Sequence, residues 1–270
     1  MTTGPGPAGA PSSMPTERTA SAPATAVARA VSLPGLPGLL RELLGPQDDW
    51  WDVDTPFEVL VGSVLVQNTS WRGVARSLDR LRAAGVASPA ALVAVPTADL
   101  VELIRPTGFP VAKERALRGL CAWWDREVGG FSVGAGRAGA FSIDEGDAGS
   151  SHPLFADAPL LPERSTGELR AGLLALRGVG PETADVVLLH LLGRGRFVAD
   201  SYARRLFVRL GWDVPRSYDA FAAQVHDRLD LPVPAWREFH ALIDVAGQAW
   251  CRSDAGWDAG PLAGRQLVSN

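Results

Sequence analysis

The sequence predicts an all-α fold, and three observations lead to this prediction. Apolar residues recur at the spacing of one helix face, as Leu169, Leu173 and Leu176 do. The segments that carry this spacing begin at residues typical of helix N-caps and end at glycine or proline. No stretch alternates apolar and polar residues strongly enough to indicate a comparable sheet.

Length and composition restrict the class of protein. The 270 residues, 46% of them hydrophobic, are enough to bury one large core or two modest ones. The sequence shows no signal peptide at its start, and no apolar stretch is long enough to span a membrane. The two cysteines, Cys121 and Cys251, are too few for a disulfide scaffold and lack the clustered spacing of a metal site. We therefore expect a soluble, monomeric protein in a reducing cytoplasm.

Two segments interrupt the helical pattern. Residues 1–31 are rich in alanine, proline, serine, threonine and glycine and show no sustained hydrophobic period, which predicts a disordered tail. In residues 129–162, glycine, serine and proline break any repeat. A structureless stretch of this length is unusual inside a compact core, so we interpret it as a flexible insertion.

The remaining segments predict helices separated by short polar breaks. Thr55 is a candidate N-cap with Pro56 at the first helical position, and the apolar residues that follow predict a buried helix, although its valines also suit a strand. Residues 88–109 predict two short helices that begin at Ser88 and Thr97.

The segment LRGVGPET predicts a turn between two helices that suits a phosphate. One helix ends at Gly178, the chain turns through Val179, and the next helix begins after Gly180 with Pro181 in its first turn. Glycines permit positive φ and leave room for an anion, while the new helix offers free N–H groups and the positive end of its dipole. The pattern indicates a helix–hairpin–helix that holds a DNA backbone without reading its sequence, with Val179 as an apolar plug. A plain helix–helix turn is the alternative.

Charge limits how nucleic acid could be bound. A formal net charge of -4 argues against a protein whose whole surface binds nucleic acid. A local basic face remains compatible with it, because the segment from Arg177 to Arg209 carries six arginines against Glu182, Asp185 and Asp200. The alternative is that these arginines cover solvated helix faces.

Two stretches in the same order resemble one known family. WWDVDTPFEVLVGSVLVQNTSW and GVGPETADVVLLHLLGRGRFVADSYARRLFVRLGW are similar to helix-hairpin-helix (HhH-GPD) DNA glycosylases of the endonuclease III superfamily, especially an endonuclease III-related branch that includes 3-methyladenine glycosylases. The resemblance spans about Leu36–Leu262, without the insertion.

The resemblance implies a two-lobed fold with a DNA cleft between the lobes. Residues 32–62 and 197–270 would form one lobe from both chain ends. Residues 63–196 would form a helical barrel that contains the helix-hairpin-helix, at about 168–193. The implied partner is double-stranded DNA with a damaged base, and in a prokaryote the protein would associate with the nucleoid.

In that family the hairpin is followed by a loop with an obligatory aspartate, which by position is Asp200 in VADSYARRL. Breaking an N-glycosidic bond builds positive charge on the deoxyribose, and a nearby carboxylate can stabilise that charge or orient the attacking water. Asp200 also suits the N-cap of the helix that follows, and one residue can serve both purposes.

Glu182 occupies the position at which bifunctional members of the family carry a lysine, whose amine forms a Schiff base with the sugar. A carboxylate cannot form this adduct, so we expect water as the nucleophile, an abasic site as the product and no AP lyase activity. Lys113, in GFPVAKERAL, is the alternative amine, and we interpret that segment as a second backbone-facing turn. Glu182 also has a purely structural interpretation as an acidic residue at a helix N-terminus.

Further residues are candidates for contacts with DNA. The resemblance assigns Gln67 to the space that a flipped base leaves in the duplex, and Asn68 follows it in the sequence. The alternative is that Gln67 is a loop residue bonded to nearby backbone. Thr183 and Arg204 are additional candidates. Five aromatic residues offer flat surfaces on which an extruded base can stack: Trp50, Trp51, Phe57, Trp71 and Tyr202. Because aromatic residues more often pack in a core, we expect about two of them in the pocket.

The C-terminal segment departs from the family pattern. Many relatives end in four cysteines that ligate a [4Fe–4S] cluster, whereas here Cys251 stands alone, and Trp257 and Gly260 occupy positions where later cysteines could stand. One thiolate cannot hold the cluster, so we expect no cofactor, with Trp250 and Trp257 as fillers. The four histidines are too dispersed in the sequence to indicate a metal site, and we expect each to be structural: His152, His190, His226 and His240.

The sequence thus predicts a base excision repair glycosylase that hydrolyses the N-glycosidic bond of a damaged base. An alkylated purine is the first candidate, because a positively charged base is already a good leaving group, and oxidised or mismatched bases are alternatives. A noncatalytic helix-hairpin-helix DNA-binding protein is the alternative from another class. Asp200 argues against it, because phosphate binding does not require an acid there.

Overall fold

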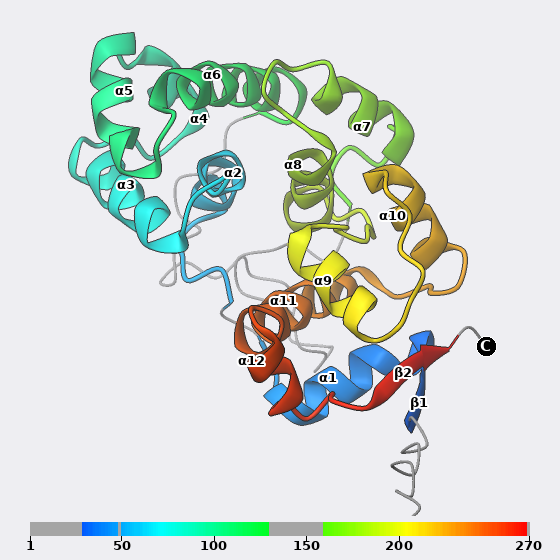
Figure 1. Ribbon diagram of the computed structural model, residues 1–270. Coiled ribbons are helices and arrows are strands. Elements are labelled where there is room, and N and C mark those ends of the chain that lie inside the picture. Colours follow the sequence, from blue (N-terminus) through cyan, green and yellow to red (C-terminus); the bar gives the residue numbers. More distant parts are fainter. Residues whose placement is uncertain (1–28, 48–49, 130–158, 269–270) are drawn as a thin grey trace, which may run out of the picture.

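The structure is a computed structural model that describes residues 29–47, 50–129 and 159–268. Most of the predicted tail and of the predicted insertion lies outside these residues. The described residues are mostly helical, which confirms the all-α prediction (Figure 1). The elements are β1 (Arg29–Ser32), η1 (Leu33–Gly35), α1 (Leu36–Leu44), α2 (Pro56–Leu65), α3 (Trp71–Ala83), α4 (Pro89–Ala94), α5 (Thr97–Ile104), η2 (Arg105–Thr107), α6 (Pro110–Glu127), α7 (Thr166–Leu174), α8 (Pro181–Val186), the π-helical turn η3 (Val187–Leu191), α9 (Ser201–Arg209), α10 (Tyr218–His226), α11 (Val233–Trp250), α12 (Asp254–Asp258) and β2 (Arg265–Val268).

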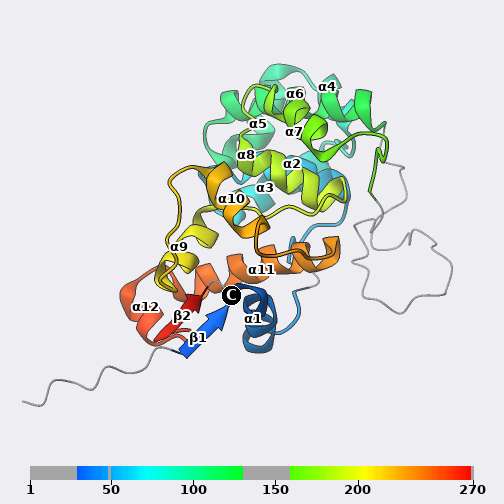
Figure 2. The ribbon, with the colours of Figure 1, turned by 90° about the vertical axis from the view of Figure 1, so that its right-hand side faces the viewer.

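The helices form two lobes (Figures 1 and 2). The barrel lobe contains α2 to α8, and the second lobe contains α1, α9, α11, α12 and both strands. In the second lobe α11 packs against α1 and α9, and it also contacts η3, which connects the two lobes. The predicted boundary between residues 62 and 63 falls inside α2. This helix packs against α6, α8 and η3, so the barrel begins with the whole of α2.

The described part of the chain has one small sheet. Strand β1 pairs in parallel with β2, with Arg29 opposite Arg265 and Ser32 opposite Val268. The prediction of a tail up to residue 31 is therefore wrong for its last three residues. Their partner lies at the other end of the chain, and pairing over that separation leaves no local pattern in the sequence.

The predicted helix starts are largely confirmed. Thr55 caps α2, since its Oγ1 accepts a hydrogen bond from the N–H of Glu58 at 3.3 Å, and Ser88 caps α4 in the same way. Thr97 differs, because it is the first residue of α5 and the cap is Pro96. Every residue of α2 from 57 to 65 is buried, which explains why its sequence lacks a polar face and resembles a strand.

Among the described residues, no helix combines the length and the apolar character that a membrane crossing needs.

Candidate functional site

The glycine hairpin connects α7 to α8 and is held by one glycine in particular. Helix α7 ends at Leu174, earlier than the predicted end at Gly178. Gly178 has φ +85°, and a Cβ there would lie 2.8 Å from Cβ of Ala116 in α6. Gly180 has φ -92° and open space beside it, so a positive φ is required at Gly178 alone. Val179 is buried, as its predicted role as a plug requires.

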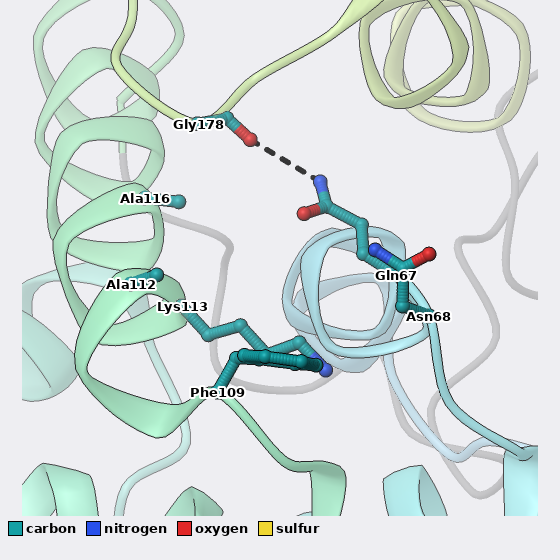
Figure 3. A pocket seen from close by; sticks show the side chains of 7 residues that line it. All are labelled: Gln67, Asn68, Phe109, Ala112, Lys113, Ala116 and Gly178. Atoms are coloured by element: carbon teal, nitrogen blue, oxygen red, sulfur yellow. Dashed lines mark hydrogen bonds between the residues drawn. The ribbon is translucent and has the colours of Figure 1, made fainter.

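Gln67 connects the end of α2 to this hairpin. Its Nε2 donates a hydrogen bond to the carbonyl oxygen of Gly178 at 3.2 Å (Figure 3). The same Nε2 donates to Oγ1 of Thr183 at 2.9 Å. The Thr183 hydroxyl is buried and donates to the carbonyl oxygen of Ser63 at 3.4 Å, so its contacts lie inside the protein. Asn68 is exposed, with φ +53°. Gln67 thus bonds to a hairpin that is distant in the sequence, and its place in the space of a flipped base stays a prediction.

A hollow of about 220 Å³ lies beside the hairpin, lined by Gln67, Asn68, Phe109 and Gly178 among others (Figure 3). Phe109 is one of the residues that sequence reasoning missed. It has φ +50° and is 71% exposed, which is unusual for a large apolar side chain. The segment TGFPVAK carried the signal, because a phenylalanine between glycine and the proline that opens α6 has no helical face to pack on.

Lys113 also lines this hollow and is the only lysine in the sequence. Its Nζ donates to the carbonyl oxygens of Leu65 at 2.9 Å and of Thr107 at 2.8 Å, and the residue is buried. Burial lowers the pKa of this amine. The ammonium group ties the start of α6 to the end of α2, which is a structural task.

Asp200 lies at the junction of the two lobes as the N-cap of α9. Its Oδ1 accepts a hydrogen bond from the N–H of Ala203 at 2.7 Å, and its side chain is 12% exposed. The pKa of Asp200 is raised to about 8, chiefly by burial and also by the carboxyls of Glu182 and Asp244, while the hydrogen bond from the Ala203 N–H lowers it. The predicted cap is therefore present, and the carboxyl is held where ionisation is costly.

Three carboxyl groups from three elements make up what we call the acidic recess: Asp200 before α9, Glu182 in α8 and Asp244 in α11. Glu182 still reaches solvent, but desolvation and the nearby Asp244 raise its pKa. The pKa of Asp244 is raised by burial, although hydrogen bonds from Gln248 and Trp50 lower it. Sequence reasoning missed Asp244, because a single acid within α11 has no distinguishing spacing.

The aromatic candidates divide into core and surface residues. Phe57 and Trp51 are buried, and Nε1 of Trp51 donates to Nδ1 of His190 at 3.1 Å. Trp71 is half-buried and meets Trp51 edge to face, with ring centroids 5.8 Å apart. Trp50 is also half-buried, beside Asp244. Among these four residues, Trp50 is therefore the one that combines partial exposure with a place at the acidic recess.

Tyr202, the fifth aromatic candidate, lies on α9 against α11. A Cβ on Gly247 would come within 2.6 Å of its ring, so the glycine makes room for the tyrosine. The guanidinium of Arg205 lies 4.5 Å from the ring centroid. Tyr202 is half-buried and lies two residues from Asp200, so a place in the base pocket stays a prediction for it and for Trp50.

The histidines are less dispersed in space than in the sequence. Nε2 of His190 and Nδ1 of His240 are 3.0 Å apart, and Nε2 of His240 lies 3.9 Å from Oδ2 of Asp200. His226 is separate and accepts a hydrogen bond from the N–H of Phe197 at 2.9 Å. His152 lies outside the described residues. Within those ranges no group of three or more histidine, cysteine or acidic residues has a metal-binding arrangement.

The basic face is smaller than the sequence suggests. Arg204 donates to the carbonyl oxygens of Pro215 at 2.5 Å and of Arg216 at 3.3 Å, so its guanidinium connects two segments of the chain. Arg194 and Arg196 are likewise bonded internally, to backbone carbonyls and to Asp185 respectively. A contact with DNA stays a prediction for Arg204, but its internal bonds alone account for an arginine at this position.

The residues present do not fit an iron–sulfur cluster. Four thiolates are needed, and the chain has two cysteines: Cys251 follows α11, and Cys121 lies in α6 in the other lobe. Trp257 is buried near Cys251, and a Cβ on Gly260 would lie 3.2 Å from Cγ of Trp250. Tryptophan side chains thus occupy this part of the lobe.

Comparisons with known proteins agree with this geometry. A sequence model described as "HhH-GPD superfamily base excision DNA repair protein" matches residues 61–229. The "Putative DNA repair glycosylase MJ1434" of Methanocaldococcus jannaschii is 32% identical over 225 residues, covering 83% of this chain and 90% of the relative.

Solved structures share the fold at lower identity. The H. pylori 3-methyladenine DNA glycosylase MagIII, bound to 1,N6-ethenoadenine, superposes with a TM-score of 0.59 at 21% identity and covers 81% of this chain and 98% of its own. A trapped endonuclease III–DNA covalent intermediate gives a TM-score of 0.57 at 22% identity, covering 84% and 90%. The chain therefore belongs to the HhH-GPD superfamily of base excision DNA repair proteins, as a DNA glycosylase.

Proposed function

We propose that this glycosylase releases alkylated, positively charged bases from double-stranded DNA by hydrolysis and has no AP lyase activity. The observation that carries the proposal is the acidic recess, where the Asp200 carboxyl is buried beside two further carboxyls. The substrate class, the nucleophile and the contacts with DNA each have support in the described residues.

The acidic recess favours a cationic base over a neutral one. With a pKa of about 8, Asp200 is mostly protonated at neutral pH in the free protein, and an ionised Asp200 is repelled by Glu182 and Asp244. A positive charge on the bound base attracts all three carboxyls and stabilises their ionised forms. An alkylated purine therefore helps to generate the carboxylate that acts on it, whereas a neutral base does not.

Water is the nucleophile that fits the site. The bond between the base and the sugar breaks with its electron pair leaving on the base, so a cationic base departs as a neutral molecule. Positive charge develops on the deoxyribose, where the Asp200 carboxylate stabilises it. The water oxygen then bonds to the sugar carbon, and the carboxylate accepts the released proton. Glu182 cannot form a Schiff base, and the Nζ of Lys113 is bonded to two carbonyls.

The hairpin side of the molecule supplies contacts with the duplex. The helical run from Pro181 to Leu191 directs the N–H groups of its first turn, after Gly180, toward a phosphate. Phe109 is suited to insert between bases, because it is apolar, largely exposed and held away from the core by its backbone. Gln67 and Asn68 lie across the same hollow and are suited to occupy the space of the flipped base.

A panel of duplexes tests the proposal. Single-turnover assays would compare 3-methyladenine and 7-methylguanine, which are cationic, with the neutral lesions 1,N6-ethenoadenine, 8-oxoguanine and a G·T mismatch. We expect rapid release of the cationic bases, with strands that remain intact until alkali is added. Release confined to neutral bases would overturn the substrate class, and borohydride trapping of a protein–DNA adduct would overturn the hydrolytic mechanism. Binding without any base release would favour the noncatalytic alternative.

A further inference from the structure

Two hydrogen bonds and one longer contact connect Trp51, in the segment before α2, to Asp200. Nε1 of Trp51 lies 3.1 Å from Nδ1 of His190, and Nε2 of His190 lies 3.0 Å from Nδ1 of His240. Nε2 of His240 in turn lies 3.9 Å from Oδ2 of Asp200. We call Trp51, His190 and His240 the Trp–His–His relay.

The indole fixes the direction of the relay. Its N–H can only donate, so Nδ1 of His190 must accept, and a neutral His190 carries its proton on Nε2. That proton is donated to Nδ1 of His240, which leaves the proton of a neutral His240 on Nε2. The N–H of His240 is therefore directed at the Asp200 carboxyl. At 3.9 Å the contact is longer than a hydrogen bond, and catalytic hydrogen bonds commonly shorten when the substrate is bound.

Packing holds both imidazole rings in this orientation. His190 lies on the π-helical turn η3, and single π-turns inside helices are frequent at functional sites. His190 and His240 are both buried. The Trp50 ring meets His240 edge to face, with centroids 4.9 Å apart, so the relay has aromatic side chains on its flank.

We propose that His240 is a positioning residue for the glycosylase reaction, and that the Trp–His–His relay keeps it as a neutral N–H donor directed at Oδ2 of Asp200. This inference rests on the proposed function, in which Asp200 must become a carboxylate. The Ala203 N–H holds Oδ1, and the His240 N–H is available to Oδ2 as negative charge develops. Because His240 cannot accept a proton from Asp200 in this arrangement, the relay favours the carboxylate over the acid.

The other charged groups around Asp200 oppose the relay or act at a greater distance. Glu182 on α8 and Asp244 on α11 both disfavour the carboxylate. Arg205 and Arg252 exert their effect on Asp244. Burial lowers the pKa of His240 to about 3, so the imidazole stays neutral over the working range. A neutral donor stabilises the carboxylate without adding a positive charge that would repel a cationic base.

The tautomers test the inference without any assay of activity. Long-range proton–nitrogen NMR of the free protein distinguishes a histidine protonated on Nε2 from one protonated on Nδ1. We expect both His190 and His240 to carry their proton on Nε2, and His240 to stay neutral from pH 5 to 8. His226 is the internal reference for the opposite tautomer, because its Nε2 accepts a backbone N–H. A His240 protonated on Nδ1 would overturn the proposal.

A pair of tryptophan variants tests the consequence for Asp200. Trp51→Phe removes the N–H that sets the direction, so the histidine pair can reverse and Nε2 of His240 can accept the Asp200 proton. The ascending limb of the single-turnover pH–rate profile should move to higher pH by about one unit. At a given pH on that limb, the variant should release base about tenfold more slowly than the wild-type protein. Trp212→Phe is the matched control, because the Trp212 indole is also buried and donates to a side chain, that of Gln224 at 2.8 Å.

These experiments distinguish a failure of the proposed function from a failure of the positioning role of His240. If the wild-type protein releases no base from any duplex, the proposed function fails, whereas the NMR result still decides the direction of the relay. If base release is present and Trp51→Phe leaves the pH profile in place while folded by circular dichroism, the positioning role of His240 is wrong. An equal displacement of the profile in Trp212→Phe would also contradict it, because that indole does not contact the relay.

Discussion

Replacing Asp200 with asparagine separates the two roles of this residue. An asparagine keeps the side-chain oxygen that caps α9, where Oδ1 now accepts the Ala203 N–H at 2.7 Å, and it has nearly the same size. What it lacks is the carboxylate that stabilises positive charge on the sugar. Base release should therefore fall by on the order of 100-fold or more, with α9 still formed.

The same substitution should stabilise the protein above neutral pH. The pKa of Asp200 is about 8 in the native state, against 3.8 for the unperturbed group. Below pH 3.8 the carboxyl is protonated in both the native and the unfolded state, so it does not lower the free energy of unfolding there. Between pH 3.8 and pH 8 the carboxyl is ionised in the unfolded state and protonated in the native state. The free energy of unfolding therefore decreases as pH rises toward 8.

The size of this effect follows from the two pKa values. Each pKa unit corresponds to about 1.4 kcal/mol, so roughly four units set an upper limit of about 6 kcal/mol above pH 8. The asparagine amide must itself be buried at a partly hydrated site, which offsets part of the gain. We expect Asp200→Asn to raise the free energy of unfolding by about 1–3 kcal/mol at pH 9 and by much less at pH 5.

Urea denaturation at pH 5 and pH 9, together with single-turnover base release, measures both effects. Asp213→Asn is the control, because Asp213 is an exposed acid. Equal stability gains at the two pH values would contradict a buried, protonated Asp200. Unchanged base release in the folded variant would leave Asp200 as a helix cap alone.

Four further substitutions and one incubation with a chelator test other parts of the protein. Gly180→Ala should stay folded, because its Cβ meets nothing within 4 Å, and should weaken binding to damaged and intact duplexes alike by about tenfold in fluorescence anisotropy. Gly178→Ala should instead lower the thermal midpoint, because φ is +85° and the new Cβ would meet Ala116. Phe109→Ala should slow release of paired damaged bases and leave the thermal midpoint unchanged, since the ring is 71% exposed. Lys113→Met should destabilise the protein, because two carbonyls lose their donor, and borohydride should trap no adduct in either form. Incubation with an iron chelator should change neither folding nor base release, and loss of either would show that the reading of the C-terminal lobe is wrong.

Continuous motifs made much of the site predictable. The hairpin glycines, Glu182 and Asp200 occur within one stretch of the chain, and the helix–turn–helix geometry follows from local rules for glycine, proline and caps. The all-α class followed in the same way from local spacing. These predictions depend on residues a few positions apart, which a sequence displays directly.

Only the tertiary structure decided which side chains meet at Asp200. Trp51 and His190 are 139 positions apart and His190 and His240 are 50, so the Trp–His–His relay has no spacing that a sequence could reveal. Asp244 has no local signal either and joins the acidic recess because α11 packs against α9. By itself the sequence determined the helices, the hairpin and the candidate carboxylate, because backbone geometry and capping are local. The packing of distant helices determined the ionisation of that carboxylate and the donors around it, because burial and charge depend on every neighbour in space.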